Sequence, residues 1–128
     1  LLAAIVNHCT ANRVAAVYYT LPDLLDRLRD SYAEDQFSPL FSRLVGVPVL
    51  ALDEVDKIRL TDWALEKVYQ LADARYRDLD TRGSLFATNT VPDAADTHMG
   101  YLYSRMHDRR NQMVEVAGGD VRPVERAA

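Results

Sequence analysis

The sequence predicts an α/β fold in which a parallel sheet carries helices on both faces. An apolar run at residues 47–52 ends in two adjacent carboxylates, Asp53 and Glu54. Polar residues after a buried strand are typical of the carboxyl edge of a parallel sheet, where ligands bind. A second apolar run, residues 84–88, ends in the amide of Asn89. Helical patterns alternate with these runs, as they do in proteins with parallel sheets.

The composition fits one globular domain and excludes several classes of protein. The chain has 128 residues, of which 48% are apolar and 27% charged. Its net charge of −4 excludes a generally basic nucleic-acid binder, so a DNA contact has to come from a local arginine patch or an assembled ring. The single cysteine, Cys9, excludes an internal disulfide and suits a reducing cytosol. The three histidines lack the spacing of zinc ligands. No apolar run approaches the roughly 20 residues that span a bilayer.

The chain begins with a predicted helix and strand. Apolar residues recur at three- and four-residue spacing over residues 1–12, which indicates a helix. Residues 14–19 are apolar and rich in β-favouring side chains, which indicates a strand.

A second helix is predicted to begin at Thr20. Asp23 lies three residues further on and Pro22 lies in the first turn, a pattern typical of helix starts. A leucine stripe follows as the buried face. Residues 33–43 are mixed in character and are predicted as a loop with a short turn around Pro39.

The middle of the chain combines the acid-terminated strand with a long helix. Residues 49–52 form the predicted strand, and Thr61 is placed to cap a helix over residues 62–79. The stripe expected to be buried consists of Leu65, Val68, Tyr69, Ala72, Tyr76 and Leu79. Arg75, Arg77 and Arg82 are expected to cover the solvated end of this helix, where cations suit the helix dipole.

The last third of the chain is predicted to contain two strands and a helix. Residues 84–88 form a strand, residues 90–100 a loop and residues 101–110 a helix. Residues 113–116 are β-favouring and are predicted as a last strand, and residues 118–128 as a C-terminal tail.

Three polar residues are candidates for chemistry at the sheet edge. Asp53 and Glu54 form an acid pair able to hold a cation and polarise a water molecule, and Asn89 is placed to orient that water. Each also has a simpler interpretation. An isolated acid pair after an apolar run is often a core strand followed by a polar turn, and asparagine is common in turns.

A basic segment near the C-terminus supplies candidate anion ligands. Arg105 and Arg109 lie four residues apart in a predicted helix, with Arg110 adjacent, so two guanidinium groups share one face. The alternative is a solvated face whose arginines pair with Asp108 or Glu115.

The sequence resembles the ATPase domain of the AAA+ superfamily, most closely bacterial helicase loaders of the DnaC type and transposition ATPases of the IstB type. The resemblance extends in order and spacing along nearly the whole chain. The segments that carry it are "YYTLPDLLDRLRDSY" (18–32), "VPVLALDEVDK" (47–57), "ALEKVYQLADARYRD" (64–78), "SLFATNTVPD" (84–93) and "YLYSRMHDRR" (101–110). The resemblance implies a P-loop NTPase-type sheet, here a truncated three-layer AAA+ core.

The resemblance also assigns roles to the candidate residues. Asp53 corresponds to the Walker B acid that holds Mg²⁺, Glu54 to the catalytic glutamate and Asn89 to sensor 1. Arg105 and Arg109 fall in the box VII region, from which an arginine finger reaches the ATP of a neighbouring subunit. Either can be the finger, and Arg109 is the favoured candidate.

One feature of the family is missing from this sequence. None of the five glycines forms part of a G-x-x-x-x-G-K-[ST] phosphate loop. In relatives that loop precedes a helix similar to residues 1–12, so residues 1–117 are interpreted as a partial AAA+ domain that lacks the first strand and Walker A. We expect this chain to bind ATP weakly or not at all.

The function implied by the resemblance is ATP-dependent loading or remodelling in DNA replication or transposition. The implied partners are a replicative helicase or a transposase, single-stranded DNA and further copies of the chain when ATP is bound, in the cytoplasm and without a membrane. The alternative is a degenerate remnant that does not hydrolyse ATP and serves as an interaction module. The missing phosphate loop favours this alternative, whereas the retained Asp53, Glu54, Asn89 and arginine pair oppose it.

Overall fold

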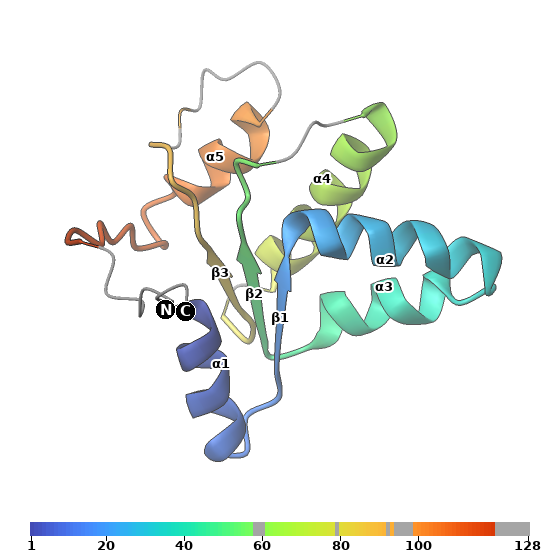
Figure 1. Cartoon of the computed structure of the whole chain (residues 1–128), viewed down its shortest axis with the longest axis horizontal. Helices are drawn as coiled ribbons and strands as arrows, with labels where there is room; N and C mark the ends of the chain where they lie inside the picture. The colour runs from blue at the N-terminus through green and yellow to red at the C-terminus, as the bar shows by residue number, and fades with distance from the viewer. Residues whose placement is uncertain (58–60, 79, 92, 94–98, 120–128) are drawn as a thin grey trace, which may run out of the picture.

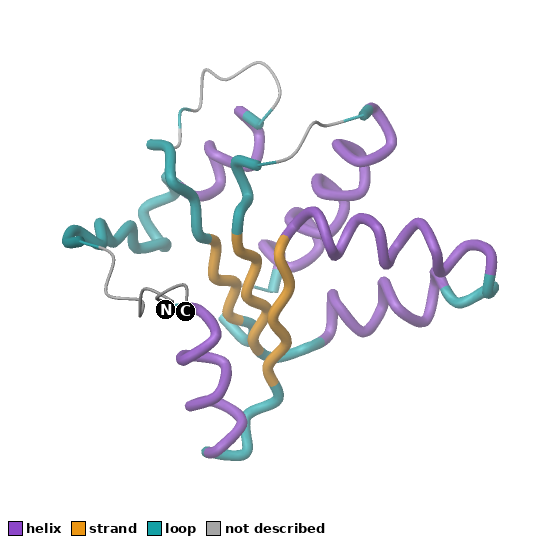
Figure 2. The backbone as a smooth tube through the Cα atoms, in the orientation of Figure 1, coloured by secondary structure: helices purple, strands orange, loops and turns teal. Residues whose placement is uncertain are grey.

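A three-stranded parallel sheet forms the centre of the protein. The computed structural model describes residues 1–57, 61–78, 80–91, 93 and 99–119. Within these residues the strands are β1 (Ala16–Thr20), β2 (Val49–Asp53) and β3 (Gly83–Phe86), in the order β1-β2-β3 (Figure 2). The predicted parallel α/β fold is therefore confirmed.

Helices cover both faces of the sheet, as Figure 1 shows. The helix α1 (Leu2–Ala11) lies on one side of the strands and runs in the opposite direction to β1. The helices on the other side are α2 (Leu21–Ala33), α3 (Phe37–Gly46) and α4 (Asp62–Arg77), and the short helix α5 (Gly100–Met106) contacts α4. None of the described helices has the length and apolar character needed to cross a bilayer.

Both predicted helix caps are present. The hydroxyl oxygen of Thr20 accepts the N–H of Asp23 at 3.2 Å, and that of Thr61 accepts the N–H of Ala64 at 3.2 Å. Each cap satisfies one N–H that the first helical turn leaves without a partner. The residue after β1 therefore starts α2 directly, which fixes the carboxyl edge of the sheet close to a helix start.

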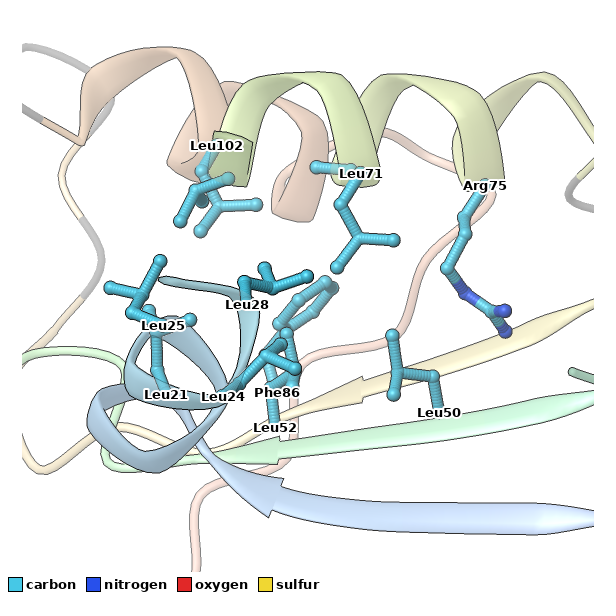
Figure 3. Close-up of a pocket in the computed structure, with 12 residues that line it drawn as sticks. Leu21, Leu24, Leu25, Leu28, Leu50, Leu52, Leu71, Arg75, Phe86 and Leu102 are labelled. Atoms are coloured by element: carbon cyan, nitrogen blue, oxygen red, sulfur yellow. The ribbon is translucent and has the colours of Figure 1, made fainter. Parts of the chain in front are cut away.

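The core lies between the sheet and the α2, α4 and α5 helices (Figure 3). Strand alternation points Leu50 and Leu52 of β2 into this core, where they meet the leucine stripe of α2. A cavity of about 10 Å³ remains, and its walls are apolar apart from Arg75. A space of this size admits about one water molecule, so it is not a ligand site.

The segment predicted as a loop at residues 33–43 is largely the helix α3 instead. Phe37, Leu40, Phe41 and Leu44 recur at the spacing of one helix face and pack against the core. Pro39 lies in the first turn, where its missing N–H breaks no helical hydrogen bond. The prediction of a loop was wrong because Pro39 marks a helix start here.

The strand predicted at residues 113–116 is absent from the described part of the chain. Residues 112–117 have no regular structure, and Met113, Val114 and Val116 are exposed. The only partner of β3 among the described residues is β2, so residues 112–117 pair with no strand. A β-favouring segment without a neighbouring strand has no ladder to join.

Arg75 corrects another prediction, because it is buried rather than solvated. Only 3% of the residue is exposed. Its guanidinium donates to the carbonyls of Leu44, Val45, Val47 and Gly83 and to the hydroxyl of Ser84, at 2.7–3.1 Å. Burial lowers the pKa of Arg75 to about 10, and the charge of Arg82 adds to this effect, so the side chain stays cationic at neutral pH.

The buried face of α4 is accordingly rotated from the predicted one. Ala64, Val68, Leu71 and Arg75 are buried. Tyr69 and Tyr76 instead meet the α5 region: the ring of Tyr69 lies 4.8 Å from that of Tyr101. Leu79 and most of the 118–128 tail lie outside the described residues.

Candidate functional site

Asp53 is the last residue of β2, the middle strand of the sheet. One carboxylate oxygen accepts the hydroxyl of Tyr18 at 2.8 Å, and the other accepts the N–H of Glu54 at 2.8 Å. A carboxylate oxygen accepts about two hydrogen bonds, so each oxygen keeps one acceptor position. The carboxylate is thus held in one orientation while it retains the capacity to bind a hydrated cation.

Glu54 follows Asp53 in a left-handed backbone conformation, with φ of 54°. Residues other than glycine rarely adopt this conformation, and its cost is of order 1–3 kcal/mol. The turn ends β2 abruptly and lets the next N–H, that of Val55, donate to the carbonyl of Ala87 at 3.1 Å. The Glu54 carboxylate forms an ion pair with Lys57 at 3.2 Å on the surface.

Asn89 is linked to the turn after Asp53 and Glu54 through Asp56, a residue that the sequence did not single out. The N–H of Asn89 donates to one oxygen of Asp56 at 3.3 Å. The other oxygen of Asp56 is buried and has no hydrogen-bond partner among the described residues. Asp56 therefore fixes the backbone at Asn89 against the turn that carries Asp53 and Glu54. The third acid in "DEVD" was the only sequence signal for this contact.

Tyr18 is the second residue that the sequence did not identify. Burial of its ring is a sufficient explanation from the sequence, yet its hydroxyl donates to Asp53. This hydrogen bond, with some burial and the nearby carboxylates, raises the pKa of Tyr18 above its usual value. Tyr18 and Asp53 are 35 residues apart in the sequence, so no local pattern reveals the contact.

Arg105 is held by neighbours on α4 and α5. Its guanidinium lies over the rings of Tyr76 and Tyr101, at 4.8 and 4.5 Å from their centroids. It also donates to the Tyr101 hydroxyl at 2.7 Å and pairs with Asp73 at 3.5 Å. An arginine held in this way anchors α5 to α4.

Arg109 lies beyond the end of α5, which corrects the prediction of one helix over residues 101–110. The helix ends at Met106, and the side-chain amide of Asn111 donates to the carbonyl of Arg105 at 2.6 Å. Arg109 is exposed and forms no hydrogen bond or ion pair with a described residue. Arg105 and Arg109 therefore do not share a helix face.

The carboxylates of Asp73 and Asp108 join α4 to the segment of residues 101–110. We expect these contacts to weaken in acid. Hydrogen bonds from Arg77 and then Tyr101 lower the pKa of Asp73, and those from Tyr76 and then Arg110 lower the pKa of Asp108. Because both pKa values are lower in the folded protein, the ionised groups stabilise the fold above about pH 4, the unfolded-state value. This contribution is lost as the pH falls through the folded-state values.

The measurement is the urea midpoint of unfolding between pH 7 and pH 3. We expect part of its decline to disappear in an Asp73→Asn, Asp108→Asn double variant, since that protein has no such carboxylates to protonate. An unchanged acid dependence in the double variant would assign the decline to other groups.

The structure thus brings some of the candidate residues together and leaves others apart. Asp53 ends β2, Glu54 follows it, and the backbone of Asn89 after β3 contacts Asp56 in the turn that continues from this acid pair. Among the described residues, no hydrogen bond or ion pair joins Arg105 or Arg109 to them. No group of three histidine, cysteine or carboxylate side chains in the described ranges is arranged to hold a metal ion on its own.

Comparisons with known proteins identify the fold. No model of a known protein family and no curated protein matches the sequence. Several solved structures do match. AMPPCP-bound DnaA from Aquifex aeolicus aligns over 80% of this chain with a TM-score of 0.69 and 16% identity, and DnaA bound to AMPPCP and single-stranded DNA gives the same values. The DnaC helicase loader aligns over 77% of the chain with a TM-score of 0.61 and 22% identity.

The chain spans only part of these proteins: 31% of the DnaA chains and 58% of the DnaC chain. The aligned part includes most of the described sheet and helices, because it covers more than three quarters of this chain. The chain therefore has the α/β fold that is seen in these DnaA and DnaC structures.

Proposed function

We propose that this chain supplies the hydrolytic side of an ATP site in a protein of the helicase-loader or transposition-helper type. The observation that carries the proposal is the position of Asp53 and Glu54 at the carboxyl end of the middle strand. Ligands of open α/β sheets bind at this edge. The fold is similar to that of DnaA bound to the nucleotide analogue AMPPCP, which supports a nucleotide as the ligand.

The donor set at Asp53 suits Mg²⁺ that is shared with a phosphate. Mg²⁺ keeps several waters and is usually bound through one or two carboxylates together with substrate phosphates. Asp53 offers a free acceptor position on each oxygen. In this role Asp53 would hold the ion, which neutralises phosphate charge when bound.

The residues that hold the phosphates of ATP in P-loop proteins have no counterpart in this sequence. The 128 residues contain no G-x-x-x-x-G-K-[ST] segment, so the backbone loop and lysine that hold a triphosphate are not found in this sequence. We therefore assign the holding of the phosphates to no residue of this chain. A fluorescent ATP analogue is expected to bind the 128-residue chain more weakly than micromolar.

Glu54 is proposed to polarise the attacking water, and Asn89 to orient it. The ion pair between Glu54 and Lys57 is exposed, and such pairs contribute less than about 1 kcal/mol. It therefore presents little barrier to a glutamate that has to accept a hydrogen bond from water. The backbone of Asn89 is fixed by Asp56, which leaves the amide exposed at the same edge.

Arg109 is proposed as the finger that reaches a neighbouring subunit's nucleotide. Arg109 is exposed and unpaired within the described part of the chain, so its guanidinium is available to a phosphate of a neighbouring subunit. Arg105 is proposed as a positioning residue, because its guanidinium is already bound by Tyr101 and Asp73. This arrangement requires a homo-oligomer when ATP is bound.

Two of the structural neighbours suggest partners for the complete protein. One neighbour is DnaA bound to single-stranded DNA and another is the DnaC helicase loader. We propose single-stranded DNA and either a replicative helicase or a transposase as partners of this protein.

A non-hydrolysing interaction module is the second candidate. The observation that favours it is that the 128 residues contain no G-x-x-x-x-G-K-[ST] phosphate loop. In this case the acid pair would serve only to end β2 and would contribute nothing to turnover.

A mixing experiment with the complete gene product tests the shared site. Glu54→Gln retains the finger and lacks the glutamate, whereas Arg109→Ala retains the glutamate and lacks the finger. We expect each variant alone to be nearly inactive in ATP hydrolysis. In a mixed oligomer about one interface in four combines an intact Glu54 with an intact Arg109, so activity should reappear. A mixture as inactive as its components would contradict a site between subunits.

A further inference from the structure

We propose that Tyr18 is a positioning residue for the cation site: its hydroxyl holds the Asp53 carboxylate in the orientation that binds a hydrated divalent cation. This inference rests on the proposed function of Asp53. The hydroxyl of Tyr18 lies 2.8 Å from one Asp53 oxygen, and the N–H of Glu54 lies 2.8 Å from the other. Two donors from opposite ends of the carboxylate fix its plane, which a single donor does not.

The register of the sheet explains why Tyr18 makes this contact. Tyr18 is paired with Ala51, and Thr20 is paired with Asp53, so Tyr18 lies on the same face as Asp53 and two residues earlier. The hydroxyl oxygen of Thr20, the direct neighbour, accepts the N–H of Asp23 at the start of α2. The longer side chain of Tyr18 therefore provides the hydroxyl that reaches Asp53 diagonally across the two strands.

The position of Tyr18 separates this role from general packing. The core cluster lies on the other face of β1, where Val17 and Tyr19 pack against it. Tyr18 is half-buried outside that cluster, and among the described residues its hydroxyl has a single hydrogen-bond partner, Asp53. Removing a residue that hydrogen-bonds to a metal ligand and orients it typically lowers metal affinity or activity by about 10–100-fold.

The experiment is a Mn²⁺ titration of the complete gene product in the presence of AMPPCP, followed by NMR, with Mn²⁺ as a paramagnetic substitute for Mg²⁺. We expect the amide signals of Asp53 and Glu54 to broaden first in the wild type. Tyr18→Phe should require about 10-fold more Mn²⁺ for the same broadening. Tyr19→Phe, which removes the adjacent hydroxyl on the opposite face, should titrate like the wild type, and Asp53→Asn should lose the selective broadening.

The outcomes distinguish the two proposals. If Tyr18→Phe requires more Mn²⁺ while its urea midpoint equals that of Tyr19→Phe, the positioning role is supported. Equal titration of Tyr18→Phe and wild type would overturn the role of Tyr18 and leave Asp53 as the cation ligand. If the Asp53 signal of the wild type does not broaden selectively, both the cation site and the role of Tyr18 are overturned.

Discussion

Replacing Arg75 with alanine is expected to lower the free energy of unfolding by about 3–5 kcal/mol. The guanidinium satisfies four backbone carbonyls, three of them at the end of α3 and before β2 and one at the start of β3. Without it these buried acceptors lose their donors, and each unsatisfied group costs about 1–3 kcal/mol unless water enters. Arg75→Lys should be intermediate, because one ammonium cannot reproduce the planar fork.

The matched control for this prediction is Arg77→Ala in the same helix. The side chain of Arg77 is 74% exposed and pairs with Asp73 on the surface, so its loss should change the unfolding free energy by less than about 1 kcal/mol. Urea denaturation followed by circular dichroism measures both variants. Equal stability losses for Arg75→Ala and Arg77→Ala would show that the buried hydrogen bonds contribute little.

Glu54→Gln is expected to lower ATP turnover by the complete gene product by about 10²–10⁴-fold. The amide is close in size to the carboxylate but cannot take a proton from the attacking water. ATP binding should persist, because Asp53 keeps its carboxylate and both of its hydrogen-bond donors.

Glu66→Gln provides the control for the lost charge. Glu66 is an exposed residue of α4 that contacts Lys67 and Gln70, and among the described residues it forms no hydrogen bond or ion pair with Asp53, Glu54 or Asn89. Its turnover should match that of the wild type. A Glu54→Gln protein that hydrolyses ATP at the wild-type rate would remove Glu54 from the mechanism and favour the interaction module.

Much of the fold was predictable because it is encoded in local patterns. The three strands appear as short apolar runs, and the caps at Thr20 and Thr61 are recognisable from residues three positions apart. The edge that carries Asp53 and Asn89 follows from strand direction alone. These features depend on residues that are close in the sequence, so the sequence of this one chain is sufficient to predict them.

The contacts that the sequence did not reveal depend on distant segments. Tyr18 meets Asp53 only because β1 and β2 pair in one particular register. Arg75 looked like a solvated helix-end arginine, although its spacing from Val68 and Leu71 places it on the buried face. Its acceptors come from α3, the turn before β2 and the start of β3, which no pattern within α4 can indicate.

The errors at residues 33–43 and 113–116 have opposite causes. Pro39 looked like a helix breaker, but in a first turn proline is tolerated. Residues 113–116 have the composition of a strand, yet β propensity forms no strand without a partner edge. In both cases the position of the segment relative to its neighbours determined the structure, and its amino-acid composition alone did not.

Asp53 is proposed to hold a cation that ATP hydrolysis needs, and Mg²⁺-dependent turnover by the complete gene product is the measurement that decides this proposal. The rate is measured with and without Mg²⁺, for the wild type and for Asp53→Asn. Hydrolysis by the wild type should require Mg²⁺, and Asp53→Asn should nearly abolish it. A wild-type product that does not hydrolyse ATP, or an Asp53→Asn product with unchanged Mg²⁺ dependence, would contradict this proposal.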